Sequence, residues 1–501
     1  MNQRRIGVLL SYINMLAKNI VTFIYIPFLI RALGQSEYGL YQMSNSIIST
    51  LSILSLGFGS AYIRFFAQAK KKARRSEVSR LNGLYLLIFL TAALLSIALG
   101  SLLVMNTKEL FSKSLSVSEI HISQILMGLM VFNVAVTFIS AIFDSYIMAN
   151  QEFRFQRSRQ LLQTFLAPIL TIPLLLLGYK AIAVVSVTSV ITVFFLFLNI
   201  RFSIGKLGMR FSFRHLSWKY FSEIGVFSLY ILANEITDQI NWNIPNFLLG
   251  IISGAKSVAV FGVASQIKTV FINLSTTLSG VFVPQINEIV VNNDDNNVLT
   301  EILTKVGRVQ AILVFYIFGG FLLLGKFFIK IWAGSNYGEA YLISVLLIIP
   351  LLVPLIQNVG IEIQRAKNRH KFRSLVYIVF AVANLGLTYL LINLVGIVGA
   401  ALGGLITMLL SNGLIMNWYY SARIKLNMAY FWKSILKLMP QFLLPTVLLS
   451  FVSSWWVIDS FLKFLIYGVF YTLIYFLVYL KWGINEREQH WITQFVSRIR
   501  K

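Results

Sequence analysis

The sequence predicts an all-α polytopic membrane protein with about 14 transmembrane helices, arranged as two pseudo-symmetric six-helix lobes plus two C-terminal helices around a central cavity. Composition, long apolar runs and the placement of charge predict this fold. Of 501 residues, 57% are hydrophobic and 12% are charged, whereas soluble domains are about 45–50% apolar and about 25% charged. A water-soluble fold is therefore excluded.

Long apolar runs account for most of the chain. A spanning helix needs about 20 predominantly apolar residues, and unbroken runs of this length favour helices over the short alternating strands of an outer-membrane barrel. The first run is too long for a signal peptide, so we expect it to stay as a helix. The expected spans cover residues 6–33, 38–67, 81–105, 122–148, 161–177, 181–204, 222–251, 258–283, 303–332, 341–363, 374–394, 398–420, 435–455 and 461–480.

Basic residues set the expected orientation. The chain has 43 Lys and Arg against 18 Asp and Glu. With the N-terminus inside, the inner segments hold about 32 of these cations and the outer segments about eight, as the positive-inside rule requires. We therefore expect a multi-pass protein of the inner (cytoplasmic) membrane with both termini cytoplasmic, whose basic segments contact membrane lipids and no nucleic acid.

No residue pattern of a soluble enzyme is present. The chain has no cysteine, so disulfides and thiolate metal sites are excluded. It also lacks a P-loop, an H-E-x-x-H helix and a G-x-S-x-G turn. We therefore expect no catalytic residue, no metal and no enzymatic activity.

A weak internal repeat indicates a duplication. Ile26-Pro27 followed by Leu33-Gly34 corresponds to Ile244-Pro245 followed by Ser253-Gly254, at an offset of about 220 residues. Pro27 and Pro245 are candidate hinges, with static kinks as the alternative. The predicted divisions are an N-lobe at 1–204 (spans one to six), a C-lobe at 205–434 (spans seven to twelve), two further spans at 435–482 and a cytoplasmic tail at 483–501.

Polar residues inside the predicted spans indicate the cavity. Asn14 and Lys18 belong to a stripe of polar residues at spacings of three and four in span one, which places them on one helix face. Asn45 and Arg64 lie in similar phase in span two. The run from 234 to 243 in span seven is too polar to face lipid. The expected cavity-lining amides are those of Asn14, Asn45, Asn234 and Asn241.

Three cations are candidate substrate-binding residues. Lys18, Arg64 and Lys268 would hold a diphosphate head group, because ammonium and guanidinium groups both bind phosphate oxygens. Glu235 or Asp238 would bind a coupling ion, and we expect no cofactor other than a coupling proton or sodium ion. In the competing interpretation, Asp238 neutralises Lys268, Glu235 neutralises Lys18, and Arg64 reaches the interface.

The N-terminal spans carry a family resemblance. The segments IPFLIRALG at 26–34, EYGLY at 37–41 and GFG at 57–59, followed by Arg64 and Phe65, resemble the opening of Wzx-type and capsule-export polysaccharide flippases, which belong to the multidrug/oligosaccharidyl-lipid/polysaccharide exporter superfamily. The resemblance implies two six-helix lobes, a basic cavity and a bacterial inner-membrane location. It also implies translocation of polyprenyl-diphosphate-linked oligosaccharide, such as an O-antigen unit, to the outer leaflet by ion-coupled alternating access. Other polysaccharide-assembly membrane proteins are possible partners on this basis.

Two other functions compete with this interpretation. A multidrug or cation antiporter of the same superfamily would share the helical bundle, but three internal cations favour an anionic substrate. A membrane-embedded polysaccharide polymerase would need a large charged outer loop or a catalytic acid at its rim. The sequence shows neither of these features.

Overall fold

The computed structural model describes residues 3–55, 57–71, 75–214, 225, 232, 235–237, 239–276, 283–292, 295–486 and 488–489. The predicted site residues Asn234 and Asp238 lie outside this set. The chain divides into two compact units. Unit 1 comprises Met1–Gly262 and Asn384–Ala400, and unit 2 comprises Val263–Ala383 and Ala401–Lys501. The domain boundaries at 204, 434 and 482 stay predictions.

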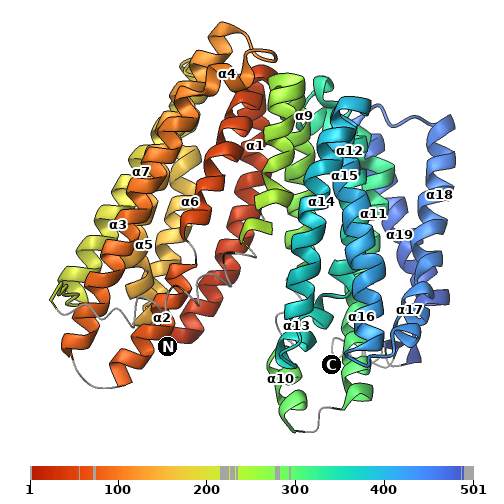
Figure 1. The fold of residues 1–501 in the computed structure, drawn as a ribbon. Coiled ribbons are helices and arrows are strands. Elements are labelled where there is room, and N and C mark those ends of the chain that lie inside the picture. The colour runs from red at the N-terminus through yellow and green to blue at the C-terminus, as the bar shows by residue number, and fades with distance from the viewer. Residues whose placement is uncertain are drawn as a thin grey trace. The chain divides into compact units, whose positions relative to one another are not determined.

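Unit 1 is organised around α5, which packs against α1, α2, α3 and α7. Figure 1 shows α3, α5 and α7 side by side. Its main elements are α1 (Gln3–Ser49), η1 (Thr50–Ser55), α2 (Phe58–Lys71), α3 (Arg75–Met105), α4 (Thr107–Phe111), α5 (Val117–Ala149), α6 (Phe153–Leu176), α7 (Ala181–Arg201) and η2 (Phe202–Lys206). It also contains α9 (Ile244–Thr276) as far as Gly262, the last part of α14 (Lys371–Val395), and α15 (Ile397–Met408) as far as Ala400.

The apolar core of unit 1 lies where α2, α3 and α5 meet. Tyr62, Tyr85 and Phe89 are fully or almost fully buried there, and the rings of Tyr62 and Tyr85 pack edge to face with centroids 5.0 Å apart. The Tyr62 hydroxyl donates to Oδ1 of Asn82 at 2.6 Å. This bond satisfies a buried polar group that would otherwise oppose folding in the membrane.

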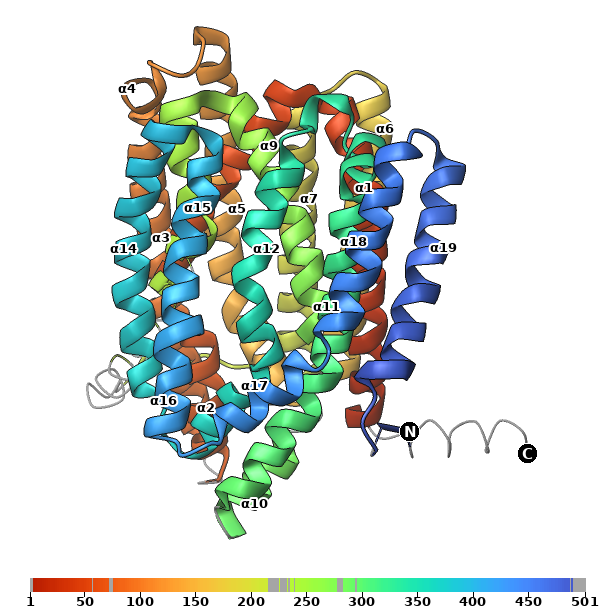
Figure 2. The ribbon, with the colours of Figure 1, turned by 90° about the vertical axis from the view of Figure 1, so that its right-hand side faces the viewer.

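Unit 2 is organised around α11, which packs against α12, α13, α17, α18 and α19. Figure 2 shows α18 and α19 side by side, joined by a short turn. Its elements, besides the remainders of α9, α14 and α15 (Ile397–Met408), are α10 (Val283–Asn292), α11 (Asn296–Trp332), η4 (Ser335–Tyr337), α12 (Ala340–Ile356), α13 (Asn358–Ala366), η5 (Leu409–Ile415), α16 (Met416–Ala422), α17 (Met428–Leu436), α18 (Met439–Trp455), α19 (Phe461–Val478) and η6 (Tyr479–Gly483).

A row of buried tyrosines packs α19 against α11 within unit 2. Tyr467, Tyr471 and Tyr475 recur every four residues along one face, and each is at most 2% exposed. The Tyr471 and Tyr475 hydroxyls donate to carbonyl oxygens of α11, at Tyr316 (2.9 Å) and Ile312 (2.6 Å) respectively. Since apolar surface alone does not drive helix association in lipid, such interhelical bonds hold α19 in place.

The predicted all-α membrane class is confirmed, because every regular element among the described residues is a helix. Of the described helices, 11 are long and apolar enough to cross a membrane, or 12 if α12 and α13, bent by 47°, form one span. Two of these candidates contain a broken helix, as described below for α1 and α9. The expected total of 14 stays a prediction.

Candidate functional site

Two glycines break α1 and α9 in the same way. Gly34 has φ 74° and ψ 171°, and Gly254 has φ 79° and ψ −179°. A positive φ is strained for residues with a Cβ, so glycine is the residue that permits these turns. The two positions are about 220 residues apart, which is the offset of the sequence repeat, and their matching geometry supports that repeat.

The glycine break makes α1 two membrane helices. Its 47 residues would extend about 70 Å as one helix, more than twice the thickness of the hydrocarbon layer. Pro27 lies inside the first of these helices. Pro245 is the second residue of α9, which begins at Ile244 directly after the turn at Asn243 that interrupts the preceding helix. Their role as hinges stays a prediction.

The second helix of α1 meets α9 on either side of the glycine break in α9, in a tight seam inside unit 1. A Cβ atom on Gly39 would overlap the carbonyl oxygen of Ala255, and one on Gly250 would overlap the side chain of Met43. The Ser114 hydroxyl donates to the Gly250 carbonyl oxygen at 2.7 Å. We call these five residues the glycine seam. The backbones can approach this closely only because the glycines carry no side chain.

The polar run of span seven and the nearby Asn246 hydrogen-bond to neighbouring elements of unit 1. Gln239 donates to Oγ of Ser52 in η1 at 3.0 Å, and Asn246 donates to Oγ of Ser46 in α1 at 3.0 Å. Asn384 of α14 donates to Oδ1 of Asn241 at 2.9 Å. Asn241, expected to face a cavity, thus has its carbonyl oxygen bound to another helix. Bonds of this kind satisfy polar groups that no water reaches in the hydrocarbon layer.

Asn384 and Thr388 of α14 were missed by the sequence analysis. Both are buried, and the Thr388 hydroxyl donates to Oδ1 of Asn384 at 3.0 Å. Their spacing of four residues places them on one face of an otherwise apolar helix. This pair of polar residues could have indicated the contact from the sequence alone. It is much shorter than the continuous polar run of span seven, however, and was therefore overlooked.

The candidates in the first two spans have different surroundings within unit 1. Asn14 donates from Nδ2 to the carbonyl oxygen of Arg157 in α6 at 2.8 Å, so its amide faces a neighbouring helix. Lys18, Asn45 and Arg64 are exposed. Exposure leaves these three side chains accessible to a ligand, and their predicted role in binding remains open to test.

Lys268 and Glu235 differ in their burial. Lys268, in the second helix of α9, belongs to unit 2 and is 8% exposed. Glu235 belongs to unit 1 and is half-buried. A single binding site formed by Lys18, Arg64 and Lys268 would join residues of both units and therefore stays a prediction. No group of three or more His, Cys, Asp or Glu residues suited to a metal occurs in the part of the chain that the structure describes.

The glycine breaks and the glycine seam lie within a region matched by a known family. The model of the family described as "Polysaccharide biosynthesis protein" matches residues 6–290. The chain belongs to this family. The match includes both broken helices and the polar run of span seven, whereas most of unit 2 lies beyond it.

Two relatives of this family member match a larger share of the chain than the family model does. The chain is 20% identical to a putative O-antigen transporter of Shigella flexneri over 419 residues, which cover 81% of this chain and 96% of the relative. It is 22% identical to the uncharacterized membrane protein EpsK of Bacillus subtilis over 426 residues, which cover 79% of this chain and 78% of the relative.

Solved structures show the same fold as this polysaccharide biosynthesis protein. The lipid II flippase MurJ in an inward closed conformation matches with a TM-score of 0.73 at 16% identity, covering 94% of this chain and 98% of that chain. An inward-facing multidrug resistance transporter of the MATE family and MOP superfamily matches with a TM-score of 0.57 at 13% identity, covering 85% and 99%. The chain therefore has the helical transporter fold of this superfamily.

Proposed function

We propose that this protein is a flippase that moves polyprenyl-diphosphate-linked oligosaccharide from the cytoplasmic to the outer leaflet of the bacterial inner membrane, for surface polysaccharide biosynthesis. The observation that carries the proposal is the family match across 6–290, a region that includes both broken helices. The similarity to an O-antigen transporter and the fold shared with a lipid II flippase support the same substrate class. The proposed activity is transport, with no catalytic step.

The proposed substrate has an anionic head and needs cations along its route. Lys18 and Arg64 are exposed side chains on α1 and α2, and the proposal assigns them to the diphosphate. An ammonium group supplies a point charge, and a guanidinium group supplies a two-pronged donor for phosphate oxygens. Lys268 is the third proposed cation, although its burial means that it would reach the substrate only after a conformational change.

The proposed orientation follows from the ends of the helices. Lys70 and Lys71 lie in the last turn of α2. Arg365 lies in the last turn of α13, and Lys367 and Arg369 lie between α13 and α14. Basic residues next to membrane helices are retained on the cytoplasmic side. We place these segments, and with them both termini, in the cytoplasm. The turns 112–116 and 177–180 of unit 1 then face outward.

The proposed transport cycle is alternating access driven by a proton or sodium gradient. Glu235 is the candidate ion site among the described residues, because a half-buried carboxylate within a membrane helix is costly unless it binds a proton or a cation. The glycine seam would separate in the state that releases substrate to the outside. Pro27 and Pro245 are proposed to bend during this change.

A multidrug or cation antiporter is the second candidate, since MATE transporters share the fold. Gene deletion separates the two functions. A flippase deletion should accumulate lipid-linked glycan on the cytoplasmic leaflet while surface polysaccharide disappears, and the cloned gene should restore export. Unchanged surface polysaccharide together with increased sensitivity to cationic drugs would reject the flippase proposal in favour of the antiporter.

A further inference from the structure

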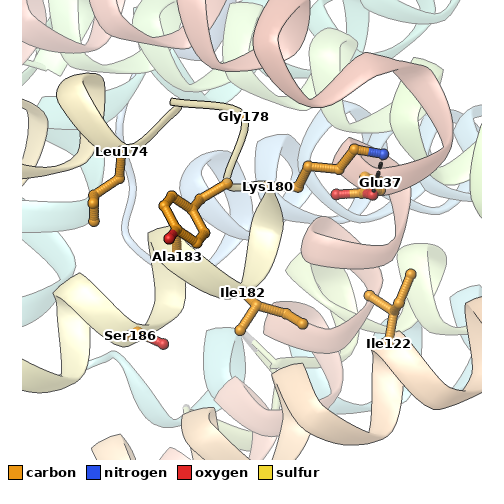
Figure 3. Close-up of a pocket in the computed structure, with 9 residues that line it drawn as sticks. Glu37, Ile122, Leu174, Gly178, Lys180, Ile182, Ala183 and Ser186 are labelled. Atoms are coloured by element: carbon orange, nitrogen blue, oxygen red, sulfur yellow. Dashed lines mark ion pairs between the residues drawn. The ribbon is translucent and has the colours of Figure 1, made fainter. Parts of the chain in front are cut away.

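Unit 1 contains a hollow that the proposed transport cycle does not use. It has a volume of about 510 Å³ and lies where α1, α5, α6 and α7 meet at the end that carries the turn 177–180. Figure 3 shows Ile122, Leu174 and Ile182 around it, with the Glu37 and Lys180 pair at one side. The volume is within the range of about 300–1,000 Å³ typical of small-molecule sites.

The walls of this hollow suit a hydrocarbon chain. Ile122, Leu174, Ile182 and Ala183 provide apolar surface, and the Ser186 hydroxyl is a polar group deeper along α7. Tyr179 lies beside them in the turn and is exposed. A tyrosine at this level suits the boundary between head groups and hydrocarbon. The hollow therefore offers an apolar interior next to a polar rim.

The ion pair at the rim leaves donors available on Lys180. Glu37 accepts from Nζ of Lys180 at 2.9 Å through one carboxylate oxygen and from the backbone N–H of Ala181 at 3.2 Å through the other. The Glu37 side chain is 14% exposed, whereas that of Lys180 is 62% exposed. A lysine ammonium has three donors, so Lys180 can bind a second anionic oxygen while it stays paired with Glu37.

The charge at the rim favours an anion. Lys180 and Glu37 cancel formally, and the N-terminus of α7, which begins at Ala181, adds a partial positive charge of about half an elementary charge. A second hollow of about 340 Å³ in unit 1 gives a useful contrast, because its lining between α3 and α5 contains no charged side chain. An apolar chain could occupy either hollow, but charge selects the head group only at the first.

We propose that the hollow bounded by Glu37, Lys180 and Ile182 binds an anionic phospholipid, with one acyl chain along the apolar walls and the phosphate on Lys180. The phosphate would lie beside the end of α7, and the chain would follow α6 and α7 into the membrane. This site is separate from the proposed route of the oligosaccharide carrier. It also does not depend on the flippase proposal.

Lipid titration of the purified full-length protein, followed by native mass spectrometry, tests the site. The probes are phosphatidylglycerol and phosphatidylcholine with identical acyl chains. We expect phosphatidylglycerol to bind about fivefold tighter, which corresponds to about 1 kcal/mol for one lysine near the membrane surface. Lys180→Ala should reduce this preference to near onefold.

Lys463 supplies the matched control. It lies in the first turn of the membrane helix α19 and pairs with a carboxylate, that of Asp459, at 2.9 Å, but it does not line the hollow. Lys463→Ala should keep the preference for phosphatidylglycerol. An equal loss in the Lys180 and Lys463 variants would reject the site, since it would show a general effect of surface charge.

Two further variants keep the proposal testable if Lys180→Ala folds poorly. Glu37→Gln retains an acceptor for the Ala181 N–H and removes the negative charge, so phosphatidylglycerol affinity should rise by a fewfold. Ser186→Leu narrows the hollow and should weaken binding of both lipids at this site. Phosphatidylglycerol affinity that is unchanged in both variants, with melting temperatures equal to that of the original protein, would overturn the proposal.

Discussion

Arg308 of α11 and Glu488 form a two-bond ion pair inside unit 2. Nε of Arg308 donates to Oε1 at 2.8 Å, and Nη2 donates to Oε2 at 2.9 Å. Further N–H groups of Arg308 donate to the carbonyl oxygens of Ser434 and Gly483, each at 2.6 Å. The guanidinium of Arg308 thus connects α11 both to α17 and to the segment that follows α19.

Breaking this pair should destabilise the protein. The two side chains are 4% and 11% exposed, and removing one partner of a buried ion pair typically costs about 3–5 kcal/mol. Arg308→Met should therefore lower the melting temperature in detergent by several degrees. Replacing both partners, as in Arg308→Met with Glu488→Leu, should restore part of the loss because no unpaired charge remains.

The Arg365 and Glu362 pair is the control for this experiment. Its bond has the same length of 2.8 Å, but the Arg365 side chain is 65% exposed. Exposed pairs contribute about 0–1 kcal/mol, so Arg365→Ala should leave the melting temperature almost unchanged. An equally small effect of Arg308→Met would show that its buried bonds contribute little.

Enlarging Gly39 should force the glycine seam apart. A Cβ at this position would overlap the Ala255 carbonyl oxygen, and such overpacking costs about 1–3 kcal/mol. The population of the closed seam should fall by about 5- to 150-fold, and glycan export should fall with it. Export by Gly39→Val, compared with the original at equal protein level, measures the effect.

Gly386 in α14 is the matched control glycine. A Cβ there would meet no atom within 4 Å, so Gly386→Val should export normally. Normal export by a stably inserted Gly39→Val protein would mean that the tight seam is not needed for transport.

The bond between Asn241 and Asn384 should couple two segments of unit 1. Hydrogen bonds between membrane helices contribute about 0.6 kcal/mol on average and up to about 1.7 kcal/mol. A double-mutant cycle with Asn241→Ala and Asn384→Ala should return a coupling energy in this range from unfolding free energies. Additive effects of the two substitutions would show that the 2.9 Å contact contributes no net stability.

Lys18 should be required for export if it binds the diphosphate. Lys18→Ala should lower glycan export more than tenfold without lowering protein level, because a charge-assisted bond to phosphate exceeds about 1.4 kcal/mol. Lys18→Arg should retain part of the activity since it keeps the positive charge. Lys481→Ala is the control at an exposed lysine that lies over the Trp482 ring. Equal export by the two alanine variants would remove Lys18 from the proposed site.

The sequence predicted the helical elements more reliably than the contacts of its polar residues. The apolar runs located most of the described helices, because the membrane requires about 20 apolar residues for each span. The turn expected between the spans 6–33 and 38–67 occurs at Gly34. By contrast, the polar run of span seven was expected to line a cavity. The hydrogen bonds that join Gln239, Asn241 and the nearby Asn246 to other helices could not be foreseen. Helix periodicity shows which residues share a face but does not show which helix lies opposite.

By itself, the sequence determined the membrane class, the internal repeat at an offset of about 220 residues, and the family resemblance. These depend on properties that each segment carries locally, namely apolar length, basic flanks and glycines at matching positions. Only the tertiary structure decided that Gly39 meets Ala255, that Lys180 pairs with Glu37 beside an apolar hollow, and that Arg308 binds Glu488. Those contacts join residues far apart in the chain, and they exist because packing brings their helices together.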